Sequence, residues 1–304
     1  MRLSVVTTLF NSGKYIQEFY TRMRVEIAKI TEDYEIIFVN DGSTDDSLTI
    51  ALELKAHDTR IKVLDLSRNF GHHKAIMTGL NKASGDFIFL IDVDLEEEPE
   101  LLSRFREEMG GTDDIDVVFG VQKNRKGGLF EKISGSLFFD VFNFISETKI
   151  PKNLILARLM SRRYLDSLLE FSETEIVFAG ISELAGYNKK ELPVEKGYKG
   201  ETTYSLSRKF RLFLNFITDF TYRPLLLIFY FGLTISILSF GFVVFLIARK
   251  ILFGLMEGWT SMIASIWLLG GIIILCIGFI GLYLSKIFLE VKNRPRTIIR
   301  KIYE

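Results

Sequence analysis

The sequence is poor in cysteine and has no excess of charge of either sign. A single cysteine, Cys276, cannot form an intrachain disulfide, which argues against an extracellular scaffold. Lys plus Arg and Asp plus Glu number 38 each among the 304 residues, so the charge balance indicates no nucleic-acid partner. The first ten residues are too short and too poorly flanked for a signal peptide. We expect them to form a strand and the N-terminal part to stay in the cytosol.

Charged residues are absent from two long stretches, 225–248 and 259–285. Each exceeds the roughly 20 residues that span a bilayer, and soluble helices of that length almost always have a polar face. We therefore predict two C-terminal transmembrane helices, with two buried helices of a soluble core as the alternative. Basic residues precede the first stretch and follow the second, so the positive-inside tendency predicts a multi-pass protein of the cytoplasmic membrane with both termini cytosolic.

The first 120 residues alternate between apolar, strand-like runs and amphipathic, helix-like segments. We expect strands at 3–9, 35–39, 61–66, 87–91 and 116–120, with helices between them. This alternation with short links predicts an α/β fold with a Rossmann-like, mostly parallel sheet wrapped by helices. Ligands of such sheets bind beyond the carboxyl ends of the strands.

The most acidic of these strand ends is Asp92-Val93-Asp94-Leu95-Glu96. Side chains at i, i+2 and i+4 of an extended segment point the same way, so the three carboxylates are expected to converge. Carboxylates that close repel one another unless a cation lies between them, and oxygen ligands suit Mg²⁺ or Mn²⁺. The alternative is a solvated acidic turn. A metal–nucleotide site is favoured because polar residues end three other strands, at Thr8 to Asn11, Asp41-Gly42 and Arg68-Asn69.

The sequence is less regular between residue 123 and the first apolar stretch. The phenylalanine-rich segment 129–150 is either a helix that closes the core or a helix that lines an acceptor groove near the bilayer. Segment 207–223 is basic and amphipathic, which is typical of a helix in the membrane interface. The predicted organisation is a cytosolic domain at 1–206, a juxtamembrane segment at 207–223, a two-helix hairpin at 224–286 and a basic tail at 287–304.

Six short motifs follow one another along the chain: Asn40-Asp41-Gly42-Ser43, Arg68-Asn69-Phe70-Gly71, Asp92-x-Asp94-Leu95-Glu96-x-x-Pro99-Glu100, Arg158-Leu159-Met160, Gly200-Glu201-Thr202-x-Tyr204 and Asn293-Arg294-Pro295-Arg296. In this order, and with two C-terminal spans, the chain resembles the polyprenyl-phosphate glycosyltransferases of glycosyltransferase family 2. That group includes dolichol-phosphate mannose synthase and bacterial undecaprenyl-phosphate glucosyltransferases. The resemblance covers nearly the whole chain, and the ordered set is specific whereas any single motif is not.

The resemblance implies a GT-A fold and an inverting, metal-dependent transfer of a sugar from a nucleoside-diphosphate sugar to a polyprenyl phosphate, undecaprenyl or dolichyl. The position of Asp41 usually contacts the nucleobase in this family, and some relatives are homotetramers. The residues that we expect at the donor are Thr8, Asn11, Asp41, Arg68 and Asp92. Those that we expect at the Mg²⁺ or Mn²⁺ ion are Asp92, Asp94 and Glu96.

Two departures from the family pattern bear on the chemistry. The usual Pro and Glu after the first strand are missing, and Leu156 stands where many members carry an aspartate proposed as the catalytic base. A phosphate acceptor does not need that base, because its second pKa of about 6 leaves it largely ionised at neutral pH. Its oxygen needs positioning and relief from charge repulsion. We expect Asp94 and Arg158 to act in catalysis, with the acceptor phosphate held by Arg158, Lys196 and Lys199.

Two other functions stay open from the sequence. One is a membrane nucleotidyl- or sugar-phosphate transferase that uses the same carboxylates and releases diphosphate or a nucleoside monophosphate. The other is a non-catalytic membrane subunit that binds a nucleotide-sugar, which Leu156 and the altered first-strand motif suggest.

Overall fold

The structure is a computed structural model that describes residues 1–110, 114–122, 153–173, 178–195, 223–253 and 258–304. The chain forms two compact units. The first comprises Met1–Asp140, Thr148–Ser205 and Arg294–Glu304, and the second Val141–Glu147 and Leu206–Asn293.

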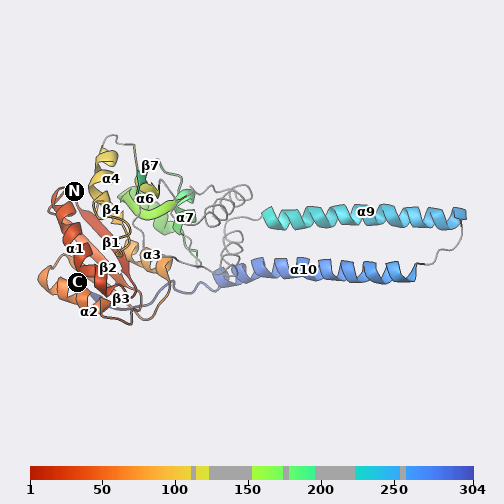
Figure 1. The fold of residues 1–304 in the computed structure, drawn as a ribbon, viewed down its shortest axis with the longest axis horizontal. Coiled ribbons are helices and arrows are strands. Elements are labelled where there is room, and N and C mark those ends of the chain that lie inside the picture. The colour runs from red at the N-terminus through yellow and green to blue at the C-terminus, as the bar shows by residue number, and fades with distance from the viewer. Residues whose placement is uncertain (111–113, 123–152, 174–177, 196–222, 254–257) are drawn as a thin grey trace. The chain divides into compact units, whose positions relative to one another are not determined.

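An eight-stranded sheet forms the centre of the first unit (Figure 1). The strands are β1 (Leu3–Leu9), β2 (Tyr34–Asn40), β3 (Ile61–Leu66), β4 (Phe87–Leu90), β5 (Val117–Gln122), β6 (Leu154–Ser161), β7 (Lys189–Val194) and β8 (Ile299–Tyr303). Their order is β7-β5-β6-β4-β1-β2-β3-β8, and β1 to β4 are mutually parallel. Strand β6 is antiparallel to β4 and β5, and β8 is antiparallel to β3. The predicted mostly parallel sheet is therefore confirmed.

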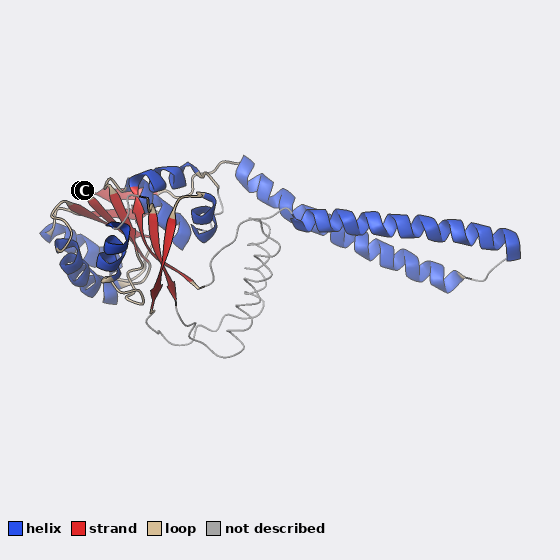
Figure 2. Cartoon of the chain, turned by 90° about the horizontal axis from the view of Figure 1, so that it is seen from above, coloured by secondary structure: helices blue, strands red, loops and turns tan. Residues whose placement is uncertain are grey.

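Helices cover both faces of this sheet (Figure 2). They are α1 (Gly13–Ala28), α2 (Ser47–His57), α3 (His72–Lys82), α4 (Leu101–Gly110), α6 (Arg162–Glu170) and α7 (Phe178–Leu184). One hydrophobic core lies under α1, α2 and α4, and the other under α3, α6 and α7. Strand β1 is buried at every residue because consecutive side chains enter opposite cores, as with Val5 and Val6.

The last residues of the chain return to the sheet as its edge strand. Arg300 of β8 pairs with Asp65 of β3 at 3.5 Å, and the hydroxyl groups of Thr78 and Thr297 lie 2.7 Å apart. Arg296 donates to the backbone oxygens of Phe171 and Glu173. Residues from 294 onward thus belong to the sheet unit, whereas the sequence suggested a separate basic tail at 287–304.

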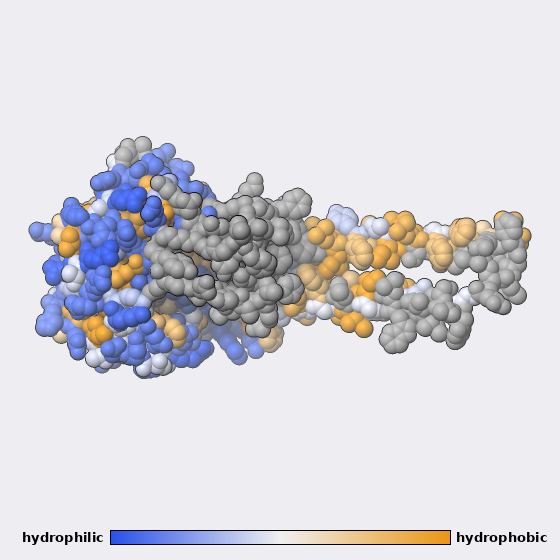
Figure 3. All heavy atoms as spheres, viewed as in Figure 1, coloured by the Kyte–Doolittle hydropathy of each residue, from blue (hydrophilic) through white to orange (hydrophobic). Residues whose placement is uncertain are grey.

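The second unit contains two long helices, α9 (Arg223–Phe253) and α10 (Trp259–Val291), of 31 and 33 residues. Within the described residues, one segment is long and apolar enough to cross a membrane, Leu269–Val291 of α10. In α9 the corresponding apolar stretch is shorter, Leu225–Ile235, so the prediction of two spans is met for one helix only. Both helices expose large apolar side chains, drawn in orange in Figure 3.

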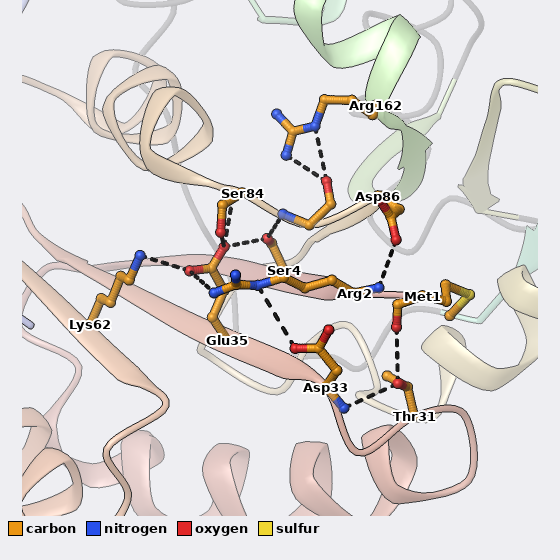
Figure 4. A network of polar contacts seen from close by, with 11 residues as sticks. Met1, Arg2, Ser4, Thr31, Asp33, Glu35, Lys62, Ser84, Asp86 and Arg162 are labelled. Atoms are coloured by element: carbon orange, nitrogen blue, oxygen red, sulfur yellow. Dashed lines mark hydrogen bonds and ion pairs between the residues drawn. The ribbon is translucent and has the colours of Figure 1, made fainter.

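A buried carboxylate connects the parallel strands near their amino ends (Figure 4). Glu35 of β2 accepts hydrogen bonds from the Ser4 hydroxyl at 2.6 Å and the Ser84 backbone N–H at 2.6 Å. It also pairs with Lys62 at 2.9 Å. Burial alone would raise the pKa of Glu35, but these hydrogen bonds outweigh it and lower the pKa to about 2. The carboxylate therefore holds β1, β2 and β3 together as an anion.

Candidate functional site

The four polar loops predicted at the strand ends lie along one edge of the sheet. Because β1, β2, β3 and β4 are parallel, with Leu9 beside Asn40 and Asn40 beside Asp65, the segments that follow them leave from the same side. The prediction that these four polar segments lie at the same side of the sheet is thus confirmed.

The loop after β1 is interlocked with the loop after β2. Asn11 takes a left-handed conformation with φ 51°, which asparagine tolerates better than most residues. Its backbone N–H donates to the Ser43 hydroxyl at 3.2 Å, and its side-chain oxygen accepts from the Thr44 backbone N–H at 2.9 Å. Ser43 and Asp45 thus bind the segment after β1, and α2 begins only at Ser47. Donor contact by Asn11 stays a prediction.

Asp41 connects the loop after β2 to the loop after β3. Its side chain is buried, and its two oxygens accept the backbone N–H groups of Phe70 at 2.7 Å and Gly71 at 3.0 Å. Gly42 follows with φ 66°, and a Cβ there would lie 2.5 Å from the backbone of Arg68 and Asn69. A carboxylate followed by glycine therefore lets the two loops pack backbone to backbone.

The described geometry gives Asp41 a role in holding the neighbouring loop, and its predicted contact with the nucleobase stays a prediction. Arg68 is exposed at the tip of that loop. Its guanidinium lies over the Phe70 ring at 4.2 Å from the centroid. The position suits contact with a bound donor, which also stays a prediction.

His72, the first residue of α3, bridges two of the predicted site residues. Its Nδ1 lies 3.1 Å from the Thr8 hydroxyl of β1, and its Nε2 lies 3.4 Å from Asp92 Oδ1 after β4. His72 thus connects Asp92 with β1. From the sequence, His72 and His73 could contact the donor, but a loop histidine is more often structural, so neither is among the predicted site residues.

The acidic loop after β4 does not have the extended backbone expected from the sequence. Strand β4 ends at Leu90, a turn follows at Val93-Asp94, and Leu95 is left-handed with φ 62°. The backbone N–H of Glu96 donates to Asp94 Oδ1 at 3.0 Å. In the parts of the chain that the structure describes, no three His, Cys, Asp or Glu side chains are grouped to hold a metal ion. The expected convergence of three carboxylates is therefore not observed.

The carboxylate oxygens of this loop are nevertheless suitable ligands for a divalent cation. Magnesium is usually held by one or two carboxylates together with the phosphates of a substrate, rather than by a complete protein cage. Asp92 and Asp94 are partly exposed and supply such oxygens. Metal binding by Asp92, Asp94 and Glu96 remains a prediction.

Glu97 was not singled out from the sequence and is the most buried carboxylate of the acidic loop, at 1% exposure. Its Oε1 accepts the Leu156 backbone N–H at 2.9 Å, and its Oε2 accepts that of Ala157 at 2.7 Å. The loop is thereby tied to β6, the strand that carries Leu156 and Arg158. A run of four acidic residues within six positions gave no indication of which one turns inward.

Arg158 lies inside the protein rather than at its surface. It is 3% exposed, its Nε donates to the Leu156 carbonyl at 3.0 Å, and its guanidinium lies over the Phe178 ring at 4.5 Å from the centroid. Burial lowers the pKa of this arginine, an effect that the negative charge of Glu97 opposes. Contact between Arg158 and an acceptor phosphate stays a prediction, and it requires the side chain to be uncovered. Lys196 and Lys199 lie outside the described residues.

Comparison with known proteins shows the family to which the chain belongs. The model of the glycosyl transferase family 2 matches residues 4–173, which include the four loops and β6. The chain is 45% identical over 304 residues to a Mycobacterium tuberculosis protein that is named as a glycosyltransferase. The alignment covers 100% of this chain and 89% of that protein. It is 32% identical over 304 residues to the SfII prophage-derived bactoprenol glucosyl transferase of Shigella flexneri, covering 99% and 98%.

Among solved structures, the chain is similar to glucosyl-3-phosphoglycerate synthase of Mycobacterium tuberculosis in complex with Mn²⁺, UDP and phosphoglyceric acid. The identity is 17% and the TM-score 0.49, with 71% of this chain and 76% of that chain covered. The family match spans more than half of the sequence and includes strands β1 to β6 of the mostly parallel sheet. The chain has the GT-A fold, is a glycosyltransferase that uses nucleotide-sugars, and belongs to glycosyl transferase family 2.

Proposed function

We propose that the protein transfers a sugar from a nucleoside-diphosphate sugar to a polyprenyl phosphate at the cytosolic face of the membrane. The observation that carries this proposal is the full-length similarity to bactoprenol glucosyl transferases, at 31–32% identity over 99% of the chain. That similarity extends through α9 and α10, beyond the matched family model, and so includes the part that would meet a lipid acceptor.

The path of the chain supports two membrane crossings. Residues Arg294–Glu304 belong to the same folded unit as Met1–Asp140 and Thr148–Ser205, and within this unit β8 pairs with β3. The chain must therefore leave and return on the same side of a bilayer, which requires an even number of crossings between these points. Helices α9 and α10 have 31 and 33 residues, each longer than the roughly 20 needed to span. A hairpin that holds the sheet unit and both termini on the cytosolic side satisfies this requirement.

The proposed reaction is a single displacement at the anomeric carbon. An oxygen of the lipid phosphate forms the new C–O bond while the bond from the sugar to the nucleoside diphosphate breaks, and the electron pair leaves with the diphosphate. The configuration at the carbon is inverted. No proton has to be removed from the phosphate dianion, which explains how Leu156 can replace an acidic residue near Arg158.

The residues at the sheet edge act by holding the reactants. Asp92, oriented by His72, and Asp94 would hold Mg²⁺ or Mn²⁺, which supplies charge neutralisation on the leaving diphosphate when bound. Arg68 is exposed on the loop after β3, and we assign it to the same diphosphate. The loops keep these groups in place before the substrates arrive, which reduces the entropic part of the barrier.

The test is transfer of radiolabel from a panel of nucleotide-sugars to undecaprenyl phosphate in detergent, with Mn²⁺, with Mg²⁺ and with chelator. We expect label in the lipid phase that depends on the metal and is lost in Asp94→Asn. Asp166→Asn is the matched control, because Asp166 is an exposed carboxylate on α6. Donor binding without any labelled lipid would favour the non-catalytic subunit, and release of a nucleoside monophosphate would favour the sugar-phosphate transferase.

A further inference from the structure

The acidic loop is attached to the sheet at both of its ends. At its start, the Ile91 backbone N–H donates to the Val6 carbonyl at 3.2 Å, which continues the pairing of β4 with β1. At its far end, the Glu97 carboxylate accepts two backbone N–H groups of β6. Asp92, Asp94 and Glu96 all lie between these two attachments.

The second attachment fills a gap in the hydrogen bonding of the sheet. The pairing of β4 with β6 ends where Leu90 lies opposite Arg158. Leu156 and Ala157 come just beyond that point, where β4 no longer supplies carbonyl groups. Leu156 is partly buried and Ala157 is buried, and the two oxygens of Glu97 provide an acceptor for the backbone N–H of each. A side chain of the loop thus takes the place of a strand.

We propose that Glu97 is a positioning residue that fixes the acidic loop for binding of the cation and the donor diphosphate. It acts through Asp92 and Asp94 and is not itself a ligand, because it is 1% exposed and each oxygen faces a backbone N–H. The same carboxylate joins the acidic loop to the strand of Arg158, so the two halves of the site are held in one arrangement. This inference rests on the proposed function.

The variants Glu97→Gln and Glu97→Asp test the proposal. In the first, an amide N–H₂ replaces one oxygen and meets a backbone N–H as a second donor. In the second, the charge is kept but the side chain is one methylene too short to reach both N–H groups. Glu98→Gln is the matched control, since Glu98 is the adjacent residue and is exposed.

The measurement is binding of Mn²⁺, followed by electron paramagnetic resonance in the presence of UDP or GDP, together with the dependence of transfer on Mn²⁺ concentration. We expect both Glu97 variants to bind Mn²⁺ at least tenfold more weakly. Their kcat at saturating Mn²⁺ should recover to within a few-fold of the wild-type value, and Glu98→Gln should behave as wild type. A merely structural role would lower the fraction of active protein while leaving the Mn²⁺ affinity of that fraction unchanged.

The variant Asp94→Asn distinguishes a failure of the positioning role of Glu97 from a failure of the proposed function. If Asp94→Asn abolishes Mn²⁺ binding while both Glu97 variants bind it as the wild type does, the positioning role is refuted and the proposed function stands. If Asp94→Asn also binds Mn²⁺ normally, the metal site of the proposed function is wrong, and the inference about Glu97 is overturned with it.

Discussion

Replacement of Asp41 by asparagine tests which of two roles this residue has. Asp41 either holds the loop after β3 in place or contacts the donor directly. The carboxylate is 2% exposed and accepts the N–H groups of Phe70 and Gly71 at 2.7 and 3.0 Å. In Asp41→Asn, one of these N–H groups faces an amide donor, and the other keeps a neutral acceptor. A hydrogen bond to a charged group contributes about 1.5–3 kcal/mol, and these two N–H groups are partly buried, so we expect a loss of about 1.5–3 kcal/mol.

The assay combines denaturant unfolding in detergent with hydrogen exchange of the Phe70 and Gly71 amides. We expect their exchange to accelerate at least about tenfold, and affinity for the nucleotide-sugar to fall as the Arg68 loop loosens. Asp46→Asn is the control, because Asp46 is exposed in the same loop and makes no side-chain cap to α2. If Asp41→Asn weakens donor binding while amide exchange and stability stay at wild-type values, Asp41 acts on the donor directly and the positioning role is refuted.

Three further predictions concern other contacts of the sheet unit. Gly42→Ala should destabilise the fold by about 2–4 kcal/mol in denaturant unfolding, because its Cβ would lie 2.5 Å from the Arg68 backbone at a positive φ. The pKa of Glu35 is lowered from 4.5 to about 2, so its anion stabilises the fold by about 3 kcal/mol above pH 4.5 and progressively less as the pH falls toward 2. The stability gap between wild type and Glu35→Gln should therefore narrow by about 2 kcal/mol from pH 7 to pH 3, and a constant gap would contradict this assignment. Arg296→Lys should release β8, because lysine cannot reach the carbonyls of Phe171 and Glu173 together, and limited proteolysis should then remove the last residues while Arg294→Lys stays intact.

The sequence predicts those parts of the fold that depend on local pattern. The bounds of β1 and β3 agree with the expected strands at 3–9 and 61–66, because parallel strands buried on both faces are continuous apolar runs. Strand β6 was not recognised, since Arg158 interrupts its apolar run and its partners β4 and β5 are distant in sequence. Strand β8 was interpreted as part of a basic tail, because Arg300 and Lys301 suit either a solvated tail or a charged edge strand.

The same holds for the candidate site: its location could be predicted from local sequence pattern, whereas the contacts between its residues could not. Its location at the carboxyl ends of β1 to β4 follows from the alternation of strands and helices. The partners of each side chain do not, because Asp41 and Asp92 are the same residue type at equivalent strand ends. Only the fold shows that Asp41 faces the backbone of the next loop, whereas Asp92 faces the ring of His72.

Loops at the carboxyl ends of strands need acceptors as well as ligands. The ladder of backbone hydrogen bonds stops where each strand stops, yet the first N–H groups beyond that point are often buried and require a partner. Asp41 and Glu97 each supply two oxygens to two N–H groups outside regular strand pairing, those of Phe70 and Gly71 in the loop after β3 and those of Leu156 and Ala157 in β6. Each carboxylate thereby connects two segments that are distant in the sequence. In this chain, burial rather than spacing therefore distinguishes the carboxylates that hold the strand-end loops, Asp41 and Glu97, from the partly exposed Asp92 and Asp94 that are predicted to bind the cation.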